Sequence, residues 1–438
     1  MKFFWYFFLL LLSSQSTKNN ASCVCTTKPP LNLDALLKDV VERNPNLAAT
    51  RPRIDAARLK VDRVQVWPDP RFMFMSMDHP IGKQCEFSPE RWFTFSQRFP
   101  IPGKLRLRGE VVEQQLEFFK SEELRTHWDL ILQTKMLFYQ LYFNKVAHDI
   151  NTQNRAIISR LIDGTLAAYK TGKGMQADVH KAHIELQLLD DELLRLDSEQ
   201  AMITAMINAL LDRPQQEPVG TPEETITDPT QLSYEELEEL AMQQRPELHG
   251  LRAMVEEQNA AARLAQREYI PDVTVGFIFQ QRPKKDKNAW GINVEFDIPL
   301  WVGERQVREK EEAEAKASAS RFELYNKQAL IRGGLKEKLA KLKAAEERIA
   351  LYKTGIVPKT IETLASQEAQ YRVGKGDFIM VLDTRRQLQD AQLNYEAARI
   401  EREILLAELE REVGAPLKKF ARPKVLCELV RGHMKKES

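Results

Sequence analysis

Three methionines stand two residues apart in the stretch FMFMSM. Met73, Met75 and Met77 alternate with other side chains, and a two-residue spacing places them on one side of an extended strand. Thioether sulfurs bind soft ions such as Cu(I), so this side could hold a heavy metal. Methionine is also an adaptable filler of apolar surfaces. The spacing therefore leaves two interpretations open, a soft-metal surface and ordinary packing in the wall of a strand assembly.

Histidine and cysteine give weaker metal signals. His180 and His183 lie three apart on an expected helix and could share a metal, but an exposed pair near a turn is the favoured interpretation. The cysteines are too scattered for a disulfide framework and stand at Cys23, Cys25, Cys85 and Cys427. Cys23 could carry a bacterial lipid or, with Cys25, bind a soft metal, although a processed leader is the simpler interpretation. We predict no resident metal and no cofactor.

Enzyme signatures are missing from the sequence. It contains no GxxxxGK phosphate loop, no HExxH, no CxxC pair and no GxSxG. Lys and Arg number 64 against 63 Asp and Glu, so no basic field indicates a nucleic-acid partner. We predict a protein with no catalytic residues that does not bind nucleic acid.

One turn phrase is written twice in the chain. YKTGKG begins at Tyr169, and YRVGKG begins at Tyr371. Glycine permits the positive φ that a tight reversal between two long helices needs, and the lysine between the glycines is expected at the exposed tip. The predicted tip residues are Gly172, Lys173, Gly174, Gly374, Lys375 and Gly376.

The two phrases belong to a tandem repeat. Asn44-Pro45 matches Arg245-Pro246 at an offset of 201, and Pro68-Asp69 matches Pro271-Asp272 at an offset of 203. The N-terminal apolar run is ten residues long and too short to cross a bilayer as a helix. We predict a signal peptide over 1–22, a leader over 23–32, a first repeat over 33–211, a linker over 212–232, a second repeat over 233–414 and a C-terminal tail over 415–438.

Each repeat is expected to contain a helix, a strand hairpin, a long helix, a turn and a helix. In the first, the pattern predicts one helix over 33–66, strands at about 71–79 and 91–99, and then a helix of roughly 60 residues. In the second, Ser233 and Glu236 predict a capping box that opens one helix reaching Tyr269. Strands are expected there at about 272–280 and 289–298.

Packing in the second repeat is predicted from a seven-residue spacing. Apolar side chains recur at this spacing in Leu335, Leu342, Ile349 and Ile356, which indicates a coiled-coil seam. Beyond the N-terminal run, no segment reaches 18 apolar residues, so any passage through a membrane would use strands.

The four strands alternate between two kinds of side chain. The apolar set comprises Phe72, Phe74, Phe93, Phe95, Val275, Phe277, Phe279, Ile292, Val294 and Phe296. The opposite set includes Met73, Met75, Met77, Asn293, Glu295 and Asp297. Such strands suit a membrane barrel, with the first set facing lipid and the second lining a lumen, although a soluble sandwich shows the same period. Two hairpins alone bury too little, so other copies of the chain must complete the sheet.

The order of these elements resembles the outer-membrane efflux protein family, the TolC-like channels. The resemblance rests on WPDP and YIPD before the first strands, on FPIPGK and DIPLWVGER after the second strands, and on the two turn phrases. It implies a mainly helical homotrimer in which a twelve-stranded membrane β-barrel continues into an α-helical tunnel in the periplasm. It also implies a passive duct in outer-membrane lipid that works with a periplasmic adaptor and an inner-membrane efflux pump. The methionines make the heavy-metal efflux subtype one hypothesis.

The resemblance also suggests a gate. Channels of this family often carry two acidic residues three apart after the second turn, and in MVLDTRRQL Asp383 matches the second position while Met380 occupies the first. The alternative for Asp383 is an ion pair with Arg386 on the same helix. The alternative function is a periplasmic coiled-coil adaptor or structural protein outside the membrane, which would not require the paired strand hairpins.

Overall fold

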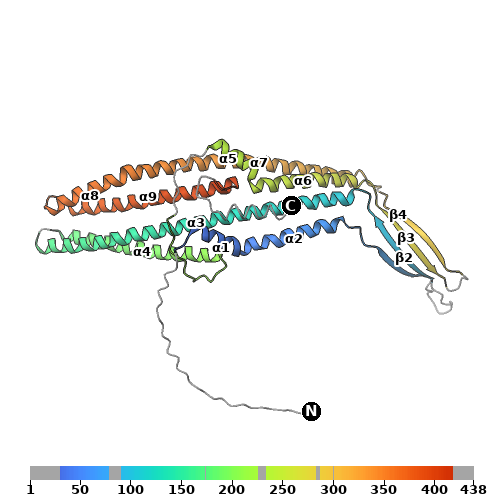
Figure 1. Ribbon diagram of the computed structural model, residues 1–438, viewed down its shortest axis with the longest axis horizontal. Coiled ribbons are helices and arrows are strands. Elements are labelled where there is room, and N and C mark those ends of the chain that lie inside the picture. Colours follow the sequence, from blue (N-terminus) through green and yellow to red (C-terminus); the bar gives the residue numbers. More distant parts are fainter. Residues whose placement is uncertain are drawn as a thin grey trace, which may run out of the picture.

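The chain forms one elongated body. The structure is a computed structural model that describes residues 30–77, 90–172, 174–224, 233–282, 287–298 and 300–417. A four-stranded sheet occupies one end of the body, and two helical hairpins end side by side at the other (Figure 1). The predicted signal peptide, the four cysteines, Lys173 and the tail beyond 417 lie outside the described residues.

The same order of elements occurs twice. The first half contains α1 (Leu33–Arg43), α2 (Pro45–Gln65), β1 (Arg71–Met77), β2 (Glu90–Phe99), α3 (Lys104–Lys170) and α4 (Gln176–Leu210). The second half contains α5 (Tyr234–Gln244), α6 (Pro246–Arg267), β3 (Val273–Gln281), β4 (Ala289–Phe296), α7 (Gln306–Leu351), the π-helical segment η1 (Tyr352–Ile356), α8 (Val357–Arg372) and α9 (Phe378–Val413). Between the halves, Leu31 forms a parallel bridge with Pro222 of the linker.

The first helix of each half is broken, which the sequence analysis did not predict. Asn44 and Arg245 have extended backbones, with ψ of 122° and 121°, and each precedes a proline that starts the next helix. A proline disfavours helical geometry in the residue before it and is itself well placed at the start of a helix. The predicted single helices over 33–66 and from Ser233 to Tyr269 are therefore wrong.

The capping box predicted at Ser233 is also wrong. Ser233 is the N-cap of α5, but its hydroxyl donates to the Glu235 carboxylate at 2.7 Å and makes no cap hydrogen bond. The nearer carboxylate takes the hydroxyl, so Glu236 has no reciprocal partner at the cap. Asn44, by contrast, does cap its helix, because its side-chain oxygen accepts from the backbone N–H groups of Asn46 and Leu47.

The long helix of the second half is interrupted. α7 ends at Leu351, and η1 separates it from α8. Pro358, in the first turn of α8, has no N–H to donate to a carbonyl four residues earlier, which favours a wider turn at this point. The predicted seam is only half right: Leu335 and Leu342 are buried, whereas Ile349 and Ile356 are half-buried. Ile356 lies in η1 itself, where the helix phase changes.

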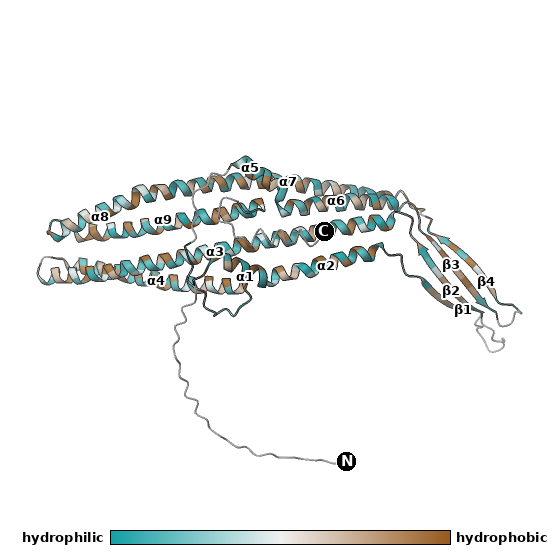
Figure 2. Cartoon of the chain, viewed as in Figure 1, coloured by the Kyte–Doolittle hydropathy of each residue, from teal (hydrophilic) through white to brown (hydrophobic). Residues whose placement is uncertain are grey.

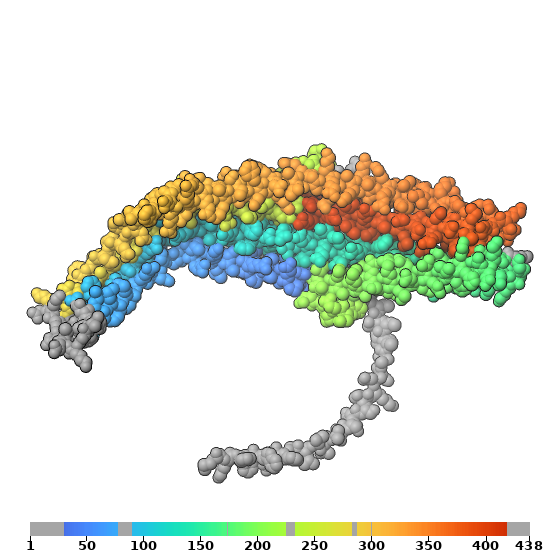
Figure 3. All heavy atoms as spheres, turned by 180° about the vertical axis from the view of Figure 1, so that it is seen from behind, coloured from blue at the N-terminus to red at the C-terminus, as the bar shows by residue number. Residues whose placement is uncertain are grey.

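Apolar side chains pack along the whole helical part. α3 packs against α1, α2, α4, α6 and α9, and α9 also packs against α7 and α8. One core cluster joins α1, α3 and the end of α4, a second joins α5, α7 and α9, and a third joins the two hairpins near their tips. The space-filling view shows α9 in red between the orange and the green hairpin segments (Figure 3). The two hairpins are thus held together along their length.

The sheet is antiparallel with the order β1-β2-β3-β4. Phe74 lies opposite Phe93 in the first pair, Phe93 opposite Phe279 in the second, and Phe277 opposite Ile292 in the third. Hydrophobic residues are dispersed along the helices (Figure 2). Among the described residues, no helix is both long enough and apolar enough to cross a membrane.

Candidate functional site

One face of the sheet is apolar and exposed. All ten residues predicted for the apolar set share this face, because the register pairs them with one another across the strands. Phe72 is 69% exposed and Ile292 is 67% exposed, so nothing in the described chain covers the face. Trp290 belongs to the same face, stacks on Phe277 and was missed by the sequence analysis, although it continues the alternation of Ile292 and Val294.

The other face gathers the methionines and polar side chains. Met73 lies opposite Thr94, Met75 opposite Trp92, and Met77 opposite Glu90. Asn293 stands across from Gly276 on this face, with its amide packed where a larger residue at 276 would place its Cβ. Glu295 follows two residues later, and Asp297 continues the same alternation just after β4. Trp92 was not predicted as part of this face, although it stands two residues before Thr94.

At the base of the sheet this second face is hollow. A depression of about 500 Å³ is lined by the carboxylates of Asp69, Asp272, Glu295 and Asp297 and by the guanidinium groups of Arg71, Arg98 and Arg108. The depression lies on the side of the sheet that carries the methionines, where the strands meet α3. Any solute on that side meets charged groups where the strands join the helices.

A buried ion cluster fixes the junction between sheet and helices. Lys104 begins α3 and is almost completely buried, with its Nζ 2.9 Å from Asp272 Oδ1, 3.1 Å from Glu268 Oε2 and 2.7 Å from the Ile270 carbonyl oxygen. Arg98 Nη2 lies 2.9 Å from Asp272 Oδ2. These contacts join the end of β2 and the start of α3 to the segment between α6 and β3. The motifs FPIPGK and YIPD end at Lys104 and Asp272, but the sequence analysis did not predict that these two residues form a buried ion pair.

The first glycine of each helical tip has the same backbone geometry. Gly172 has a φ of 73° and Gly374 a φ of 74°, and their N–H groups donate to the carbonyls of Tyr169 and Tyr371, both at 3.0 Å. A side chain at Gly376 would approach the Tyr371 backbone nitrogen to 2.8 Å, so glycine is also required there by close packing. Lys375 is exposed. The positive φ predicted for the two reversals is confirmed at Gly172 and Gly374, whereas Gly174 and Gly376 do not have it.

The tips touch each other through their flanking residues. Burial and the negative charge of Asp178 on α4 raise the pKa of Tyr371 on α8. Tyr371 also packs on Phe378 at the start of α9, with ring centroids 5.7 Å apart. His180 and His183 are both exposed on α4, as the favoured interpretation had them. In the part of the chain that the structure describes, no three His, Cys, Asp or Glu residues gather in a way that could hold a metal.

The predicted gate residues lie in the first turns of α9. Met380 and Asp383 are exposed, whereas Phe378 and Leu382 between and beside them are buried in the cluster that joins the hairpins. Within the described residues, no ion pair joins Asp383 to Arg386, the alternative considered above. The neighbouring Arg385 instead bonds Glu368 of α8 at 2.5 Å.

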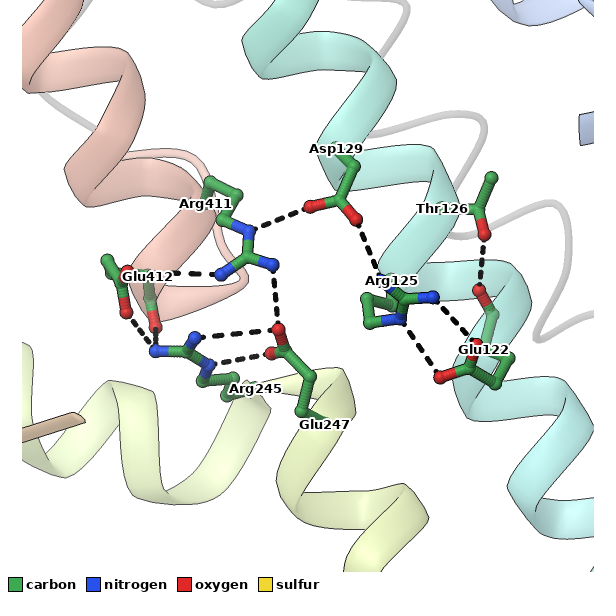
Figure 4. Close-up of polar contacts among 8 residues, drawn as sticks. All are labelled: Glu122, Arg125, Thr126, Asp129, Arg245, Glu247, Arg411 and Glu412. Atoms are coloured by element: carbon green, nitrogen blue, oxygen red, sulfur yellow. Dashed lines mark hydrogen bonds and ion pairs between the residues drawn. The ribbon is translucent and has the colours of Figure 1, made fainter. Parts of the chain in front are cut away.

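A second charged cluster ties the two halves near mid-length. Arg245, at the break between α5 and α6, binds the carboxylates of Glu247 and Glu412 (Figure 4). Arg411 connects Glu247, at 2.8 Å, to Asp129 of α3, also at 2.8 Å, and Asp129 continues the chain of contacts to Arg125. Burial alone would raise the pKa of Glu247, but hydrogen bonding and the positive charges of Arg245 and Arg411 outweigh it and hold that pKa below 4.5.

Comparisons of the sequence and of the structure with known proteins agree with the fold described above. Residues 237–415 match the family model described as outer membrane efflux protein. No curated protein matches the chain in sequence. The structure resembles the outer-membrane channel OprN, with 17% identity over 87% of this chain and 90% of that one and a TM-score of 0.74. It also resembles the outer-membrane protein VceC of Vibrio cholerae, with 15% identity over 88% and 97% of the two chains and a TM-score of 0.75.

A third solved structure, that of CusC, has 14% identity over 87% of this chain and 92% of that one, with a TM-score of 0.77. At these identities the likeness shows the fold, which is the fold of the outer-membrane channels. The family model adds the sequence pattern of that family over most of the second half. The comparisons therefore show the fold of these channels over most of the chain and the sequence pattern of outer membrane efflux proteins over residues 237–415.

Proposed function

We propose that this chain is the outer-membrane exit duct of a tripartite efflux system. The observation that carries the proposal is a four-stranded sheet with an exposed apolar face. The Lys104 cluster joins this sheet to the helical hairpins. Strands of this kind can cross a bilayer only in a closed barrel. Three copies would supply twelve strands, and their hairpins would continue the barrel as a tunnel. The duct conducts solutes passively and catalyses no reaction.

In this assembly the two faces of the sheet have different surroundings. The phenylalanine-rich face contacts lipid, and the face with Met73, Asn293 and Glu295 lines the lumen. The charged depression at the base of the second face supports this orientation, because charged groups belong in water and not in lipid. Trp290 stands on the lipid side, where aromatic rings favour the membrane interface.

The tips would meet the periplasmic adaptor that connects the duct to an inner-membrane pump. Three copies present six tips, and Lys375 is an exposed charged group at each second tip. Met380 and Asp383 lie just beyond it and would form the gate, as a single ring of three carboxylates. Such a ring attracts cations and repels anions in a constriction.

Fractionation tests the central proposal. The full chain, purified in detergent from isolated outer membranes, should have the intact mass of three copies. A soluble monomer in the periplasm would overturn the duct and favour the alternative of a coiled-coil adaptor or structural protein.

We further propose that the duct carries heavy-metal ions. Three copies would bring nine methionine sulfurs of β1 to the lumen, together with Trp92 opposite Met75. Replacing Met73, Met75 and Met77 together with Leu should lower tolerance to copper and silver and leave tolerance to an organic drug unchanged. Ile278→Leu, on the same face but without sulfur, serves as the control. Unchanged metal tolerance would leave the methionines as packing residues.

A further inference from the structure

We propose a specific strand register between copies of the chain: β4 of one copy pairs with β1 of the next so that Val294 lies opposite Phe74 and Asp297 opposite Arg71. The inference rests on the proposed multimeric duct. In the part of the chain that the structure describes, β1 and β4 are the edges of the sheet and each has one strand neighbour. An exposed edge offers a row of unpaired backbone groups that a second strand can satisfy.

The two hairpins have the same internal register. Arg71 lies opposite Ser96 in the first, and Thr274 lies opposite Glu295 in the second. The first and third strands are therefore related by an offset of 203, and the second and fourth by an offset of 199. The sequence supports both offsets independently, because Asp69 corresponds to Asp272 and Pro100 to Pro299.

The register between β2 and β3, where the two hairpins meet, predicts the register between β4 of one copy and β1 of the next. Within the chain, Phe95 of β2 lies opposite Phe277 of β3, and Arg98 lies opposite Thr274. Moving each β2 residue forward by 199 and each β3 residue back by 203 pairs Val294 with Phe74 and Asp297 with Arg71. The same shift pairs Phe296 with Phe72 and Asn293 with Met75. Each of these pairs joins residues of the same face, as a continuous sheet requires.

Charge complementarity supports this register. Arg71 and Asp297 are exposed, and in the described chain neither takes part in an ion pair. At the matching place in the seam within the chain, Arg98 lies opposite the uncharged Thr274 and pairs with Asp272, which corresponds to Asp69. Between copies, Asp297 takes the place of Arg98 and Arg71 the place of Thr274, so opposite charges face each other directly. Glu295, two residues from Asp297, lies diagonally across from Arg71 and within reach of a long side chain.

Cysteine cross-linking tests the register in the full chain. In a background with Cys23, Cys25, Cys85 and Cys427 replaced by Ser, oxidation of the pair Val294→Cys and Phe74→Cys should shift the chain to covalent trimers. Directly opposite positions have Cα separations that a disulfide accepts. The lumen pair Asn293→Cys and Met75→Cys should do the same. These two pairs cover both the wide and the narrow positions of the ladder.

Slipped pairs are the matched controls. Val294→Cys combined with Phe72→Cys or with Ser76→Cys keeps the same face but displaces the partner by two residues, and should leave the chain monomeric on a denaturing gel. Trimers from a slipped pair and not from the proposed pairs would overturn the register while supporting the duct. Absence of cross-linking in every pair, with a monomeric mass in detergent, would overturn the duct itself.

Charge exchange gives an independent test. Arg71→Asp or Asp297→Arg alone should lower the melting temperature of the trimer, because each places like charges opposite each other. The double exchange should recover part of the loss. Additive losses in the double variant would contradict the proposed pair.

Discussion

The two halves of the chain make equivalent hydrogen bonds with different side chains. In each, the residue before the proline that breaks the first helix donates a hydrogen bond to a carbonyl at the end of the last helix. Asn44 Nδ2 donates to the Leu210 carbonyl at 3.0 Å, and Arg245 Nη1 donates to the Glu412 carbonyl at 3.2 Å. The donors are 201 positions apart and the acceptors 202. The position of the donor, and not its residue type, is what this fold requires.

The surroundings of the two donors differ. Asn44 is a neutral amide that also caps α2, whereas Arg245 is a cation only 2% exposed and held by Glu247 and Glu412. A buried charge is stable only while its partners stay in place. The second half is therefore fixed by a charge cluster that extends to α3, and the first half by the hydrogen bonds of a neutral amide. This difference predicts unequal responses to equivalent changes.

Replacing the two donor residues should give the largest difference in stability between the halves. Arg245→Met leaves Glu247 and Glu412 with Arg411 as their remaining cation, and we expect the free energy of unfolding to fall by roughly 3 kcal/mol. Asn44→Ala removes a neutral donor and should cost about 1 to 3 kcal/mol. Loss of helical circular dichroism on heating and in denaturant measures both. Equal losses would mean that the charge of Arg245 contributes nothing beyond the shared hydrogen bond.

Equivalent changes on the sheet should instead affect the two halves alike. Phe74 and Phe277 are 203 positions apart and occupy the same face. Phe74→Lys and Phe277→Lys should each cost roughly 2 to 4 kcal/mol per chain near the membrane midplane and reduce the yield of trimer. Asn293→Lys, on the opposite face, should be tolerated. An equal loss of trimer in all three variants would invalidate the assignment of lipid and lumen faces.

The faces of the sheet could be predicted from the sequence, whereas the break in the first helix of each half was not predicted. A two-residue period places each strand residue on a face, so Phe72 and Met73 could be assigned to opposite sides without coordinates. The break at Asn44 was signalled by Pro45, but the helical pattern was interpreted as one continuous helix over 33–66. Lys104 and Arg245 stood in matched phrases of the repeat, but their burial could not be predicted, because a charged residue looks the same in sequence whether it lies in solvent or in a cluster. Only the packing of distant segments buries them.

Acid should weaken the second half before the first. The pKa of Glu247 is lower in the folded chain than its ordinary value of 4.5. Its contribution to stability is therefore complete above 4.5 and is lost as the pH falls below that value toward the lower folded pKa. Asn44 and its amide have no such dependence. Melting temperatures measured from neutral pH into this acid range should fall less steeply in Glu247→Gln than in the unmodified chain, and identical slopes would contradict the assignment.

The smallest effect is expected at the tips, where the halves match in backbone and differ in charge. Asp383 of α9 corresponds, at the offset of 202 that relates Gly172 to Gly374, to Lys181 of α4, and both are exposed. If only the second tip lines the constriction, Asp383→Ala should reduce the cation preference of single channels in planar bilayers, and Lys181→Ala should leave it unchanged. If both tips lined it alike, the lysine ring would oppose the carboxylate ring. Lys181→Ala would then raise the preference, and the halves would share the gate.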